Sequence, residues 1–90
     1  ELRDFKKLTT EFGIAVLTDK NPLDAISVAR ELNAFAINPK HSHLTQEIIN
    51  DIHSEGFEIH TWTVNRKKRI EELISWKVDG IITDFPDMVF

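Results

Sequence analysis

Cysteine is absent from the 90 residues, which excludes disulfide bonds and thiolate metal sites. No apolar run approaches the roughly 20 residues that a membrane-spanning helix needs. The chain opens at Glu1 without a methionine and without the basic and apolar segments of a secretory signal. We expect no membrane span, a cytoplasmic location, and a chain that is a piece of a longer or processed protein.

Positive charge is also scarce, since 15 acidic residues outnumber 11 lysines and arginines and leave a net charge of -4. This balance disfavours non-specific binding to nucleic acid, and we expect no nucleic-acid partner. Apolar residues make up 41% of the chain and charged residues 29%, which is typical of a globular protein. The length suits one small domain.

Three short apolar runs, at residues 14–17, 34–37 and 80–83, predict buried strands. The stretch of residues 57–65, FEIHTWTVN, predicts a further buried strand, whose last four residues turn towards the next helix. Helical spacing of apolar residues precedes each run. The first such segment, residues 2–12, carries Leu2, Phe5, Leu8 and Phe12 and is predicted to be a helix ended by Gly13.

The other helix boundaries carry recognisable capping residues. Asn21-Pro22 predicts the start of the second helix, and Thr45 the N-cap of the third. Gly56 is expected to end that third helix, and Asn65 can cap the fourth. The three inner stripes are predicted to be Ala25, Val28, Ala29 and Leu32; Ile48, Ile49 and Ile52; and Ile70, Leu73, Ile74 and Val78.

Alternating helices and strands predict a parallel α/β sheet with right-handed crossovers. Four such units suit either a small open sheet or half of a (β/α)8 barrel, whose full length is roughly 250 residues. A half-barrel exposes unpaired strand edges, which invite pairing with another chain. We therefore expect self-association if the chain exists alone.

Two stretches carry the functional information: His60-Thr61-Trp62-Thr63-Val64-Asn65, and residues 78–86, VDGIITDFP. Together they resemble the C-terminal half of the glycerophosphodiester phosphodiesterase family, in which a strand ending WTVN is followed by a helix and then VDGIITD-x-P. The resemblance is dense from Asn38 onward and looser before it. It implies that residues 1–90 form one partial domain, the C-terminal half of a TIM barrel with strands five to eight.

The resemblance also implies an activity, the hydrolysis of glycerophosphodiesters to an alcohol and glycerol 3-phosphate. Family members use a divalent cation, Ca²⁺ or Mg²⁺, held by acidic residues, and a histidine pair for proton transfer. Those groups come from the N-terminal half, and their motifs have no match here. The resemblance therefore predicts no catalytic residue and no metal ligand in this chain, which would supply one wall of an active site completed by the missing N-terminal half.

Three residues are candidates for substrate binding. Trp62 stands at the C-terminal end of its strand, where barrels bind ligands, although a core tryptophan facing the helices is the alternative. Asn65 either contacts substrate or caps the next helix. Asp84 either binds a hydroxyl group or stabilises the turn into Pro86.

Arg66-Lys67-Lys68-Arg69 places four cations in the first turn of a helix, where the macrodipole prefers acids. Arg66 and Lys67 are therefore candidates for binding an anion, because loops after the last strands of many barrels bind phosphate. The alternative is a solvated run paired with Glu71 and Glu72.

The histidines carry weaker hypotheses. His41 and His43 have a spacing that suits a transition metal, but no cysteine or acid-rich partner lies nearby in the sequence. Glu58 and His60 share one face of their strand and are expected to pair. Two alternatives to a phosphodiesterase fragment stay open: an inactive half-barrel scaffold, and an α/β module that binds a small phosphorylated ligand.

Overall fold

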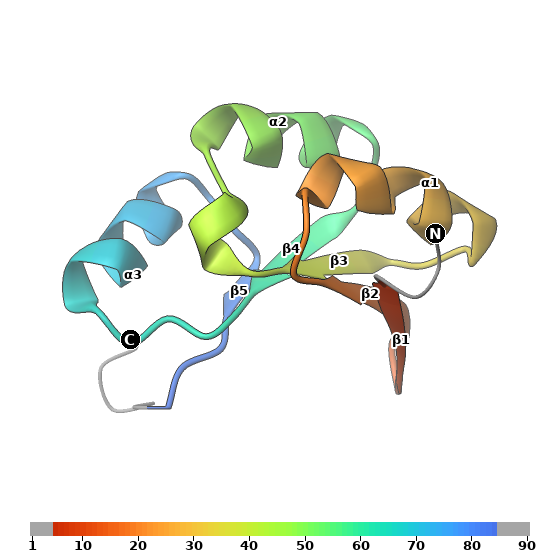
Figure 1. The fold of residues 1–90 in the computed structure, drawn as a ribbon, viewed down its shortest axis with the longest axis horizontal. Helices are drawn as coiled ribbons and strands as arrows, with labels where there is room; N and C mark the ends of the chain where they lie inside the picture. Colours follow the sequence, from red (N-terminus) through yellow and green to blue (C-terminus); the bar gives the residue numbers. More distant parts are fainter. Residues whose placement is uncertain (1–4, 85–90) are drawn as a thin grey trace.

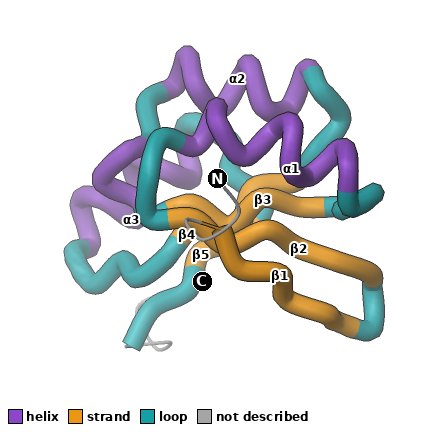
Figure 2. The backbone as a smooth tube through the Cα atoms, turned by 45° about the vertical axis from the view of Figure 1, so that its right-hand side comes forward, coloured by secondary structure: helices purple, strands orange, loops and turns teal. Residues whose placement is uncertain are grey.

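A computed structural model describes residues 5–84 as five strands with helices on one side (Figures 1 and 2). The sheet order is β1-β2-β3-β4-β5, so strands that follow each other in the sequence are neighbours in the sheet. The strands are β1 (Phe5–Thr10), β2 (Gly13–Thr18), β3 (Ala36–Pro39), β4 (Glu58–Thr61) and β5 (Gly80–Ile81). From β2 to β5 every pairing is parallel, as predicted.

Each parallel crossover contains a helix. The α-helices are α1 (Ala25–Glu31), α2 (Gln46–Ser54) and α3 (Lys67–Ser75), and two 3₁₀ turns, η2 (Pro22–Asp24) and η3 (His41–His43), precede α1 and α2. Asn21 accepts a hydrogen bond from the amide of Leu23, and Thr45 caps α2 by accepting from the amide of Ile48 at 3.2 Å. The predicted start at Thr45 is confirmed, whereas Asn21 begins the 3₁₀ turn η2 and α1 follows it with Asp24 as its N-cap.

The core lies between the helices and one face of the sheet. Val16, Ile37 and Ile59 face the helices from the three central strands and are fully buried. The predicted helix stripes supply the other half of the core through the fully buried residues Ala25, Ala29, Ile49, Ile52, Ile70 and Leu73. Since side chains alternate along a strand, Leu17, Asn38 and His60 occupy the opposite face, away from the helix layer.

The helix predicted over residues 2–12 is wrong within the described residues; Leu2 lies outside them. Residues 5–10 form β1, which pairs antiparallel with all of β2 through a two-residue turn. Gly13 follows that turn with φ 127°, a conformation that favours glycine. As a strand, this segment leaves Phe12 76% exposed. The helical spacing of the apolar residues in this segment indicates only that the segment is amphipathic. As a strand, β1 forms hydrogen bonds with the edge of β2, which would otherwise be unpaired.

The sheet is therefore mixed rather than wholly parallel, and the predicted αβαβαβαβ order fails at its first element. From β2 onward the alternation of strand and helix holds. Among the described residues, no helix is long and apolar enough to cross a membrane.

Candidate functional site

The two sequence motifs meet where β4 and β5 end. Asn65 donates from Nδ2 to Oδ2 of Asp84 at 3.0 Å. Its Oδ1 accepts from the hydroxyl of Thr83 at 3.1 Å and from the amide of Asp84 at 3.0 Å. These three hydrogen bonds join loops that are 18 and 19 residues apart in the sequence, and they hold Asp84 beside the exit of β4.

The alternative in which Asn65 caps α3 is wrong. The N-cap of α3 is Arg66, and no side chain caps this helix. The side-chain amide of Asn65 instead contacts Thr83 and Asp84, in the loop after β5. A rule for helix boundaries that uses only neighbouring residues cannot foresee this contact.

Trp62 follows β4 directly and lies beside Lys40 in a parallel bridge. Strand alternation places its indole on the same face as His60, opposite to the buried helix-facing residues Ile59 and Thr61. Its Nε1 donates to the carbonyl of Asn38 at 2.8 Å. This half-buried position on the face away from the helices does not agree with a core tryptophan packed beneath them.

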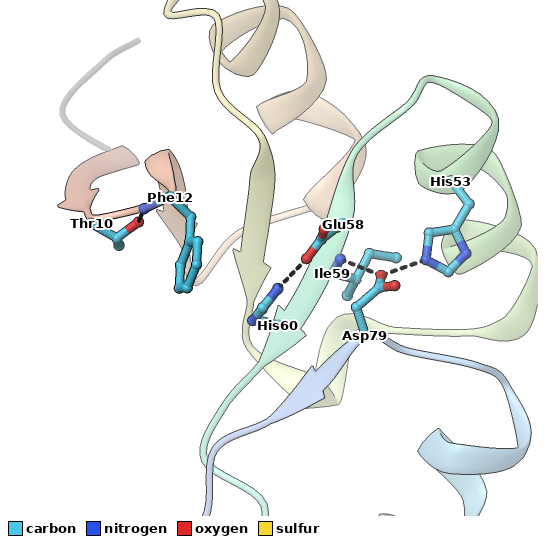
Figure 3. A network of polar contacts seen from close by, with 7 residues as sticks. All are labelled: Thr10, Phe12, His53, Glu58, Ile59, His60 and Asp79. Atoms are coloured by element: carbon cyan, nitrogen blue, oxygen red, sulfur yellow. Dashed lines mark hydrogen bonds and ion pairs between the residues drawn. The ribbon is translucent and has the colours of Figure 1, made fainter.

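The predicted pair of Glu58 and His60 is confirmed, with 2.9 Å between Oε1 and Nε2 (Figure 3). The edge of the Phe35 ring packs against the imidazole, with 6.1 Å between ring centroids. Across the sheet, a Cβ atom at Gly80 would lie 2.9 Å from Nδ1 of His60, so glycine is required for the imidazole to keep this position.

A second polar contact ties the other end of β4 to the β5 unit. Oδ2 of Asp79 accepts from the amide of Ile59 and lies 2.8 Å from Nε2 of His53, on α2 (Figure 3). The amide of Asp79 in turn donates to the carbonyl of Ile59 at 2.9 Å. This reciprocal pair extends the contact between β4 and the two-residue strand β5 by one position.

A pocket of about 410 Å³ opens between η3 and the start of α3. The lining residues are His41, Thr63, Val64, Asn65, Arg66 and Arg69. Of the two candidates for anion binding, Arg66 lines this pocket and Lys67 does not. The sequence analysis considered His41 only for a metal and Arg69 only as part of the basic run, so it did not place the two together in this pocket. The spacing of Arg66 and Arg69 at i and i+3 does place both on one side of a helix.

Arg69 fixes the wall of this pocket. Its Nε donates to Nδ1 of His41 at 3.2 Å, and its NH2 group donates to the carbonyls of His41 and Leu44. The guanidinium also pairs with Glu72 and lies 5.3 Å from the ring centroid of Trp76. The predicted pairing of the basic run with nearby acids is confirmed for Arg69 alone among the described residues.

The imidazole of His41 lies in a positive environment. Burial lowers the pKa of its imidazole below 6.5, and the charges of Arg69, Lys40 and Arg66 lower it further. Because Nδ1 accepts from Arg69, the proton of the neutral ring belongs on Nε2. These neighbouring cations make His41 a poor metal ligand, and residues 5–84 contain no group of three or more histidine, aspartate or glutamate side chains that could hold a metal ion.

Comparison with known proteins assigns the family. Residues 1–88 match the Glycerophosphoryl diester phosphodiesterase family. The chain belongs to this family. It is 31% identical over 86 residues to a glycerophosphodiester phosphodiesterase of Caldanaerobacter subterraneus and 33% identical over 85 residues to one of Bacillus altitudinis. These alignments cover 96% and 92% of this chain but only 35% of each relative, so the chain spans about a third of their length.

Solved structures support the fold. A phosphodiesterase of Oleispira antarctica, in complex with the product sn-glycerol-3-phosphate, aligns with a TM-score of 0.75 at 16% identity. The alignment covers 81% of this chain and 30% of that one. A structure from Silicibacter pomeroyi aligns with a TM-score of 0.72 at 24% identity, covering 82% of this chain and 28% of its own. These comparisons confirm the suspected family. They also support the TIM-barrel fold for the family, whose solved structures align with most of this chain.

Proposed function

We propose that this chain is the C-terminal half-barrel of a phosphodiesterase that hydrolyses glycerophosphodiesters to an alcohol and glycerol 3-phosphate. Membership of the family supplies the reaction class. The single observation that carries the assignment to this chain is the contact of Asn65 with Thr83 and Asp84, because it brings both family motifs together at one edge of the sheet. In α/β barrels that edge carries the active site.

The sheet order supports strands five to eight of a barrel rather than an open doubly wound sheet. From β2 to β5 each strand pairs with the next in the sequence, without the reversal of strand order that marks a doubly wound fold. All three α-helices lie on one side (Figure 2), as they do around a barrel. The opposite face would then line the barrel interior.

In this proposal Trp62, Asn65 and Asp84 form one wall of the substrate site. Trp62 presents an aromatic surface on the inner face, suited to packing against the carbon atoms of a glycerol group. Asp84 offers a carboxylate that can accept from a hydroxyl group, and Asn65 orients it. The proton-transfer groups would come from the preceding half of the barrel.

The divalent cation expected for the family has no fitting ligand set among residues 5–84, where three-residue groups of potential ligands are absent. In this proposal, which follows the family resemblance, acidic residues of the N-terminal half would hold Ca²⁺ or Mg²⁺. The required partner is that missing half, provided by the same polypeptide or by association of two chains. The chain alone should show no hydrolysis of glycerophosphocholine with either metal.

A chimaera tests this function. The chain replaces the segment that it matches in the Caldanaerobacter enzyme, and hydrolysis of glycerophosphocholine is measured with Ca²⁺ and with Mg²⁺. We expect metal-dependent turnover by the chimaera, and a kcat/KM lowered about fivefold or more by Trp62→Ala, since an aromatic contact of this size contributes about 1 kcal/mol or more.

Trp76→Ala is the matched control, because Trp76 packs on Arg69 in the helix layer and not on the inner face. Equal losses of kcat/KM in the two variants would remove Trp62 from the substrate site. Metal-dependent turnover by the isolated chain would show that the catalytic groups are present after all. A folded chimaera without activity would contradict the assignment of the reaction.

A further inference from the structure

The outer edge of β2 is occupied in a way that a closed barrel does not allow. In a (β/α)8 barrel every strand has a parallel neighbour on both sides. β2 pairs parallel with β3, but its other edge pairs antiparallel with β1, from Phe5 opposite Thr18 to Thr10 opposite Gly13 (Figure 1). If β2 to β5 are strands five to eight of a barrel, a strand of the preceding half needs this same edge.

The two paired strands differ in their side chains. β2 contains the apolar run of residues 14–17, in which Ala15 and Val16 are at most 2% exposed. Such a run is typical of a parallel strand that is buried on both faces. β1 instead carries Lys6, Lys7 and two threonines, and lysines are common on outer strands, where they hinder pairing with other chains. β2 therefore has the composition of a central strand, and β1 that of an edge strand.

Packing holds β1 only loosely. Phe5 is partly buried and packs against the hydrophobic core, whereas the other five residues of β1 are exposed. A cleft of about 210 Å³ lies beside the strand, and its lining residues are Phe5, Lys6, Lys7, Val16, Val28 and Leu32. The last two belong to the end of α1, so this cleft separates part of β1 from the helix layer. Release of β1 would expose little apolar surface besides Phe5, which is typical of segments that open locally.

The turn between β1 and β2 is fixed by its own residues. The hydroxyl of Thr10 accepts from the amide of Phe12 at 3.1 Å (Figure 3) and donates to the carbonyl of Gly13 at 3.0 Å. The Phe12 side chain is 76% exposed. These contacts span at most three residues, so β1 and its turn form a local arm that can leave the sheet without disturbing the contacts of the three helices.

We propose that β1 is a displaceable cover of the β2 edge, which leaves this edge when a parallel strand of the preceding half-barrel pairs with β2. This inference rests on the proposed function. The incoming strand supplies the hydrogen bonds that β1 gives up, so the backbone groups of β2 are paired in both states. In the isolated chain β1 protects the edge of β2, and in the larger protein it competes with closure of the barrel.

An engineered disulfide that locks β1 to β2 tests this inference, because the chain has no cysteine of its own. Lys6 and Leu17 are partners in the antiparallel register. Paired Cα atoms in such a ladder lie about 4.5–5.5 Å apart, which suits a disulfide. The Caldanaerobacter chimaera with Lys6→Cys and Leu17→Cys is assayed on glycerophosphocholine after oxidation and after reduction. We expect kcat/KM to be about tenfold or more lower in the oxidised form, since few locked molecules can close the barrel.

The two single variants, treated in the same way, are the matched controls. Each should have the same activity after oxidation as after reduction. Full activity of the oxidised double variant, with its disulfide verified, would overturn the inference and leave the proposed function intact. A reduced chimaera without activity would instead contradict the proposed function, and hydrogen exchange of the isolated chain then decides on β1.

Hydrogen exchange measures the release of β1 without any enzyme assay. In the isolated wild-type chain, the amides of β1 that bond to β2 should exchange about tenfold or more faster than the amide of Ile37 in β3, because local opening requires less free energy than unfolding of the core. The oxidised disulfide should slow the exchange of these β1 amides. Exchange of β1 as slow as that of Ile37 in the wild type would overturn the inference.

Discussion

Replacement of Asp79 tests how the short strand β5 is attached to the rest of the sheet. The ladder between β4 and β5 pairs two residues of each strand, and the reciprocal contact between Asp79 and Ile59 extends that junction. The Ile59 amide belongs to a fully buried residue and donates to the Asp79 carboxylate at 2.8 Å. Asp79→Ala leaves this donor without its acceptor.

The magnitude follows from two contributions. An unsatisfied buried amide costs about 1–3 kcal/mol. The contact of Asp79 with His53 is one-third exposed on each side, so it adds about 1 kcal/mol or less. We therefore expect Asp79→Ala to lower the free energy of unfolding by about 2–3 kcal/mol. Asp79→Asn keeps an acceptor oxygen and should cost about 1 kcal/mol, while His53→Gln should cost less than about 1 kcal/mol.

Urea unfolding at neutral pH gives these three values, and hydrogen exchange locates the effect. The amide of Ile59 should exchange faster in Asp79→Ala, whereas that of Ile37, one strand away, should change less. A loss in His53→Gln as large as in Asp79→Ala would refute the reasoning, because it would place the stabilising energy in the surface pair. An unchanged Ile59 exchange rate would refute it as well.

Two further predictions concern titration and assembly. Burial and three neighbouring cations lower the pKa of His41 below 6.5 in the folded chain. The unfolded chain therefore binds a proton at His41 more readily than the folded chain does. The free energy of unfolding is at its full value above pH 6.5 and decreases as the pH falls towards the lowered pKa. Unfolding between pH 7.5 and 5 should therefore show the wild type losing stability relative to His41→Gln, and parallel pH profiles would contradict this. The isolated chain should self-associate through its open sheet face and outer strand edges, and a monomeric mass by sedimentation at micromolar concentration would count against it.

Most of the fold from β2 to α3 was predictable because its signals are local. Apolar stripes at helical spacing identified most of the buried faces, although Ile74 is 44% exposed. Thr45 identified the start of α2 and Asn21 that of the 3₁₀ turn η2, through contacts within three residues. The segment at residues 5–12 was not predictable in this way. Its structure depends on the free edge of β2, a tertiary requirement that overrides the helical spacing of Phe5, Leu8 and Phe12.

The candidate site shows the same division. Position at a strand end made Trp62, Asn65 and Asp84 candidates, because barrels bind their ligands at that edge. The partners of those residues were not visible, since Asn65 meets Asp84 across 19 positions and Arg69 meets His41 across 28. The alternative of Asn65 as a local helix cap failed because its amide makes a contact that only the packed sheet creates.

The two faces of the sheet bear on whether the chain is a complete module. The helix-facing side is apolar and fully buried, whereas the opposite side carries Asn38 and the Glu58–His60 pair. Within residues 5–84, Oδ1 of Asn38 is the buried side-chain polar atom without a partner, and such a group costs about 1–3 kcal/mol until a donor reaches it. A free-standing sheet gains nothing from a polar inner face with an unsatisfied acceptor. In a barrel, the same polar face would line an interior shared with a preceding half. The polar character of this face therefore supports the proposal that this chain is one wall of a larger active site.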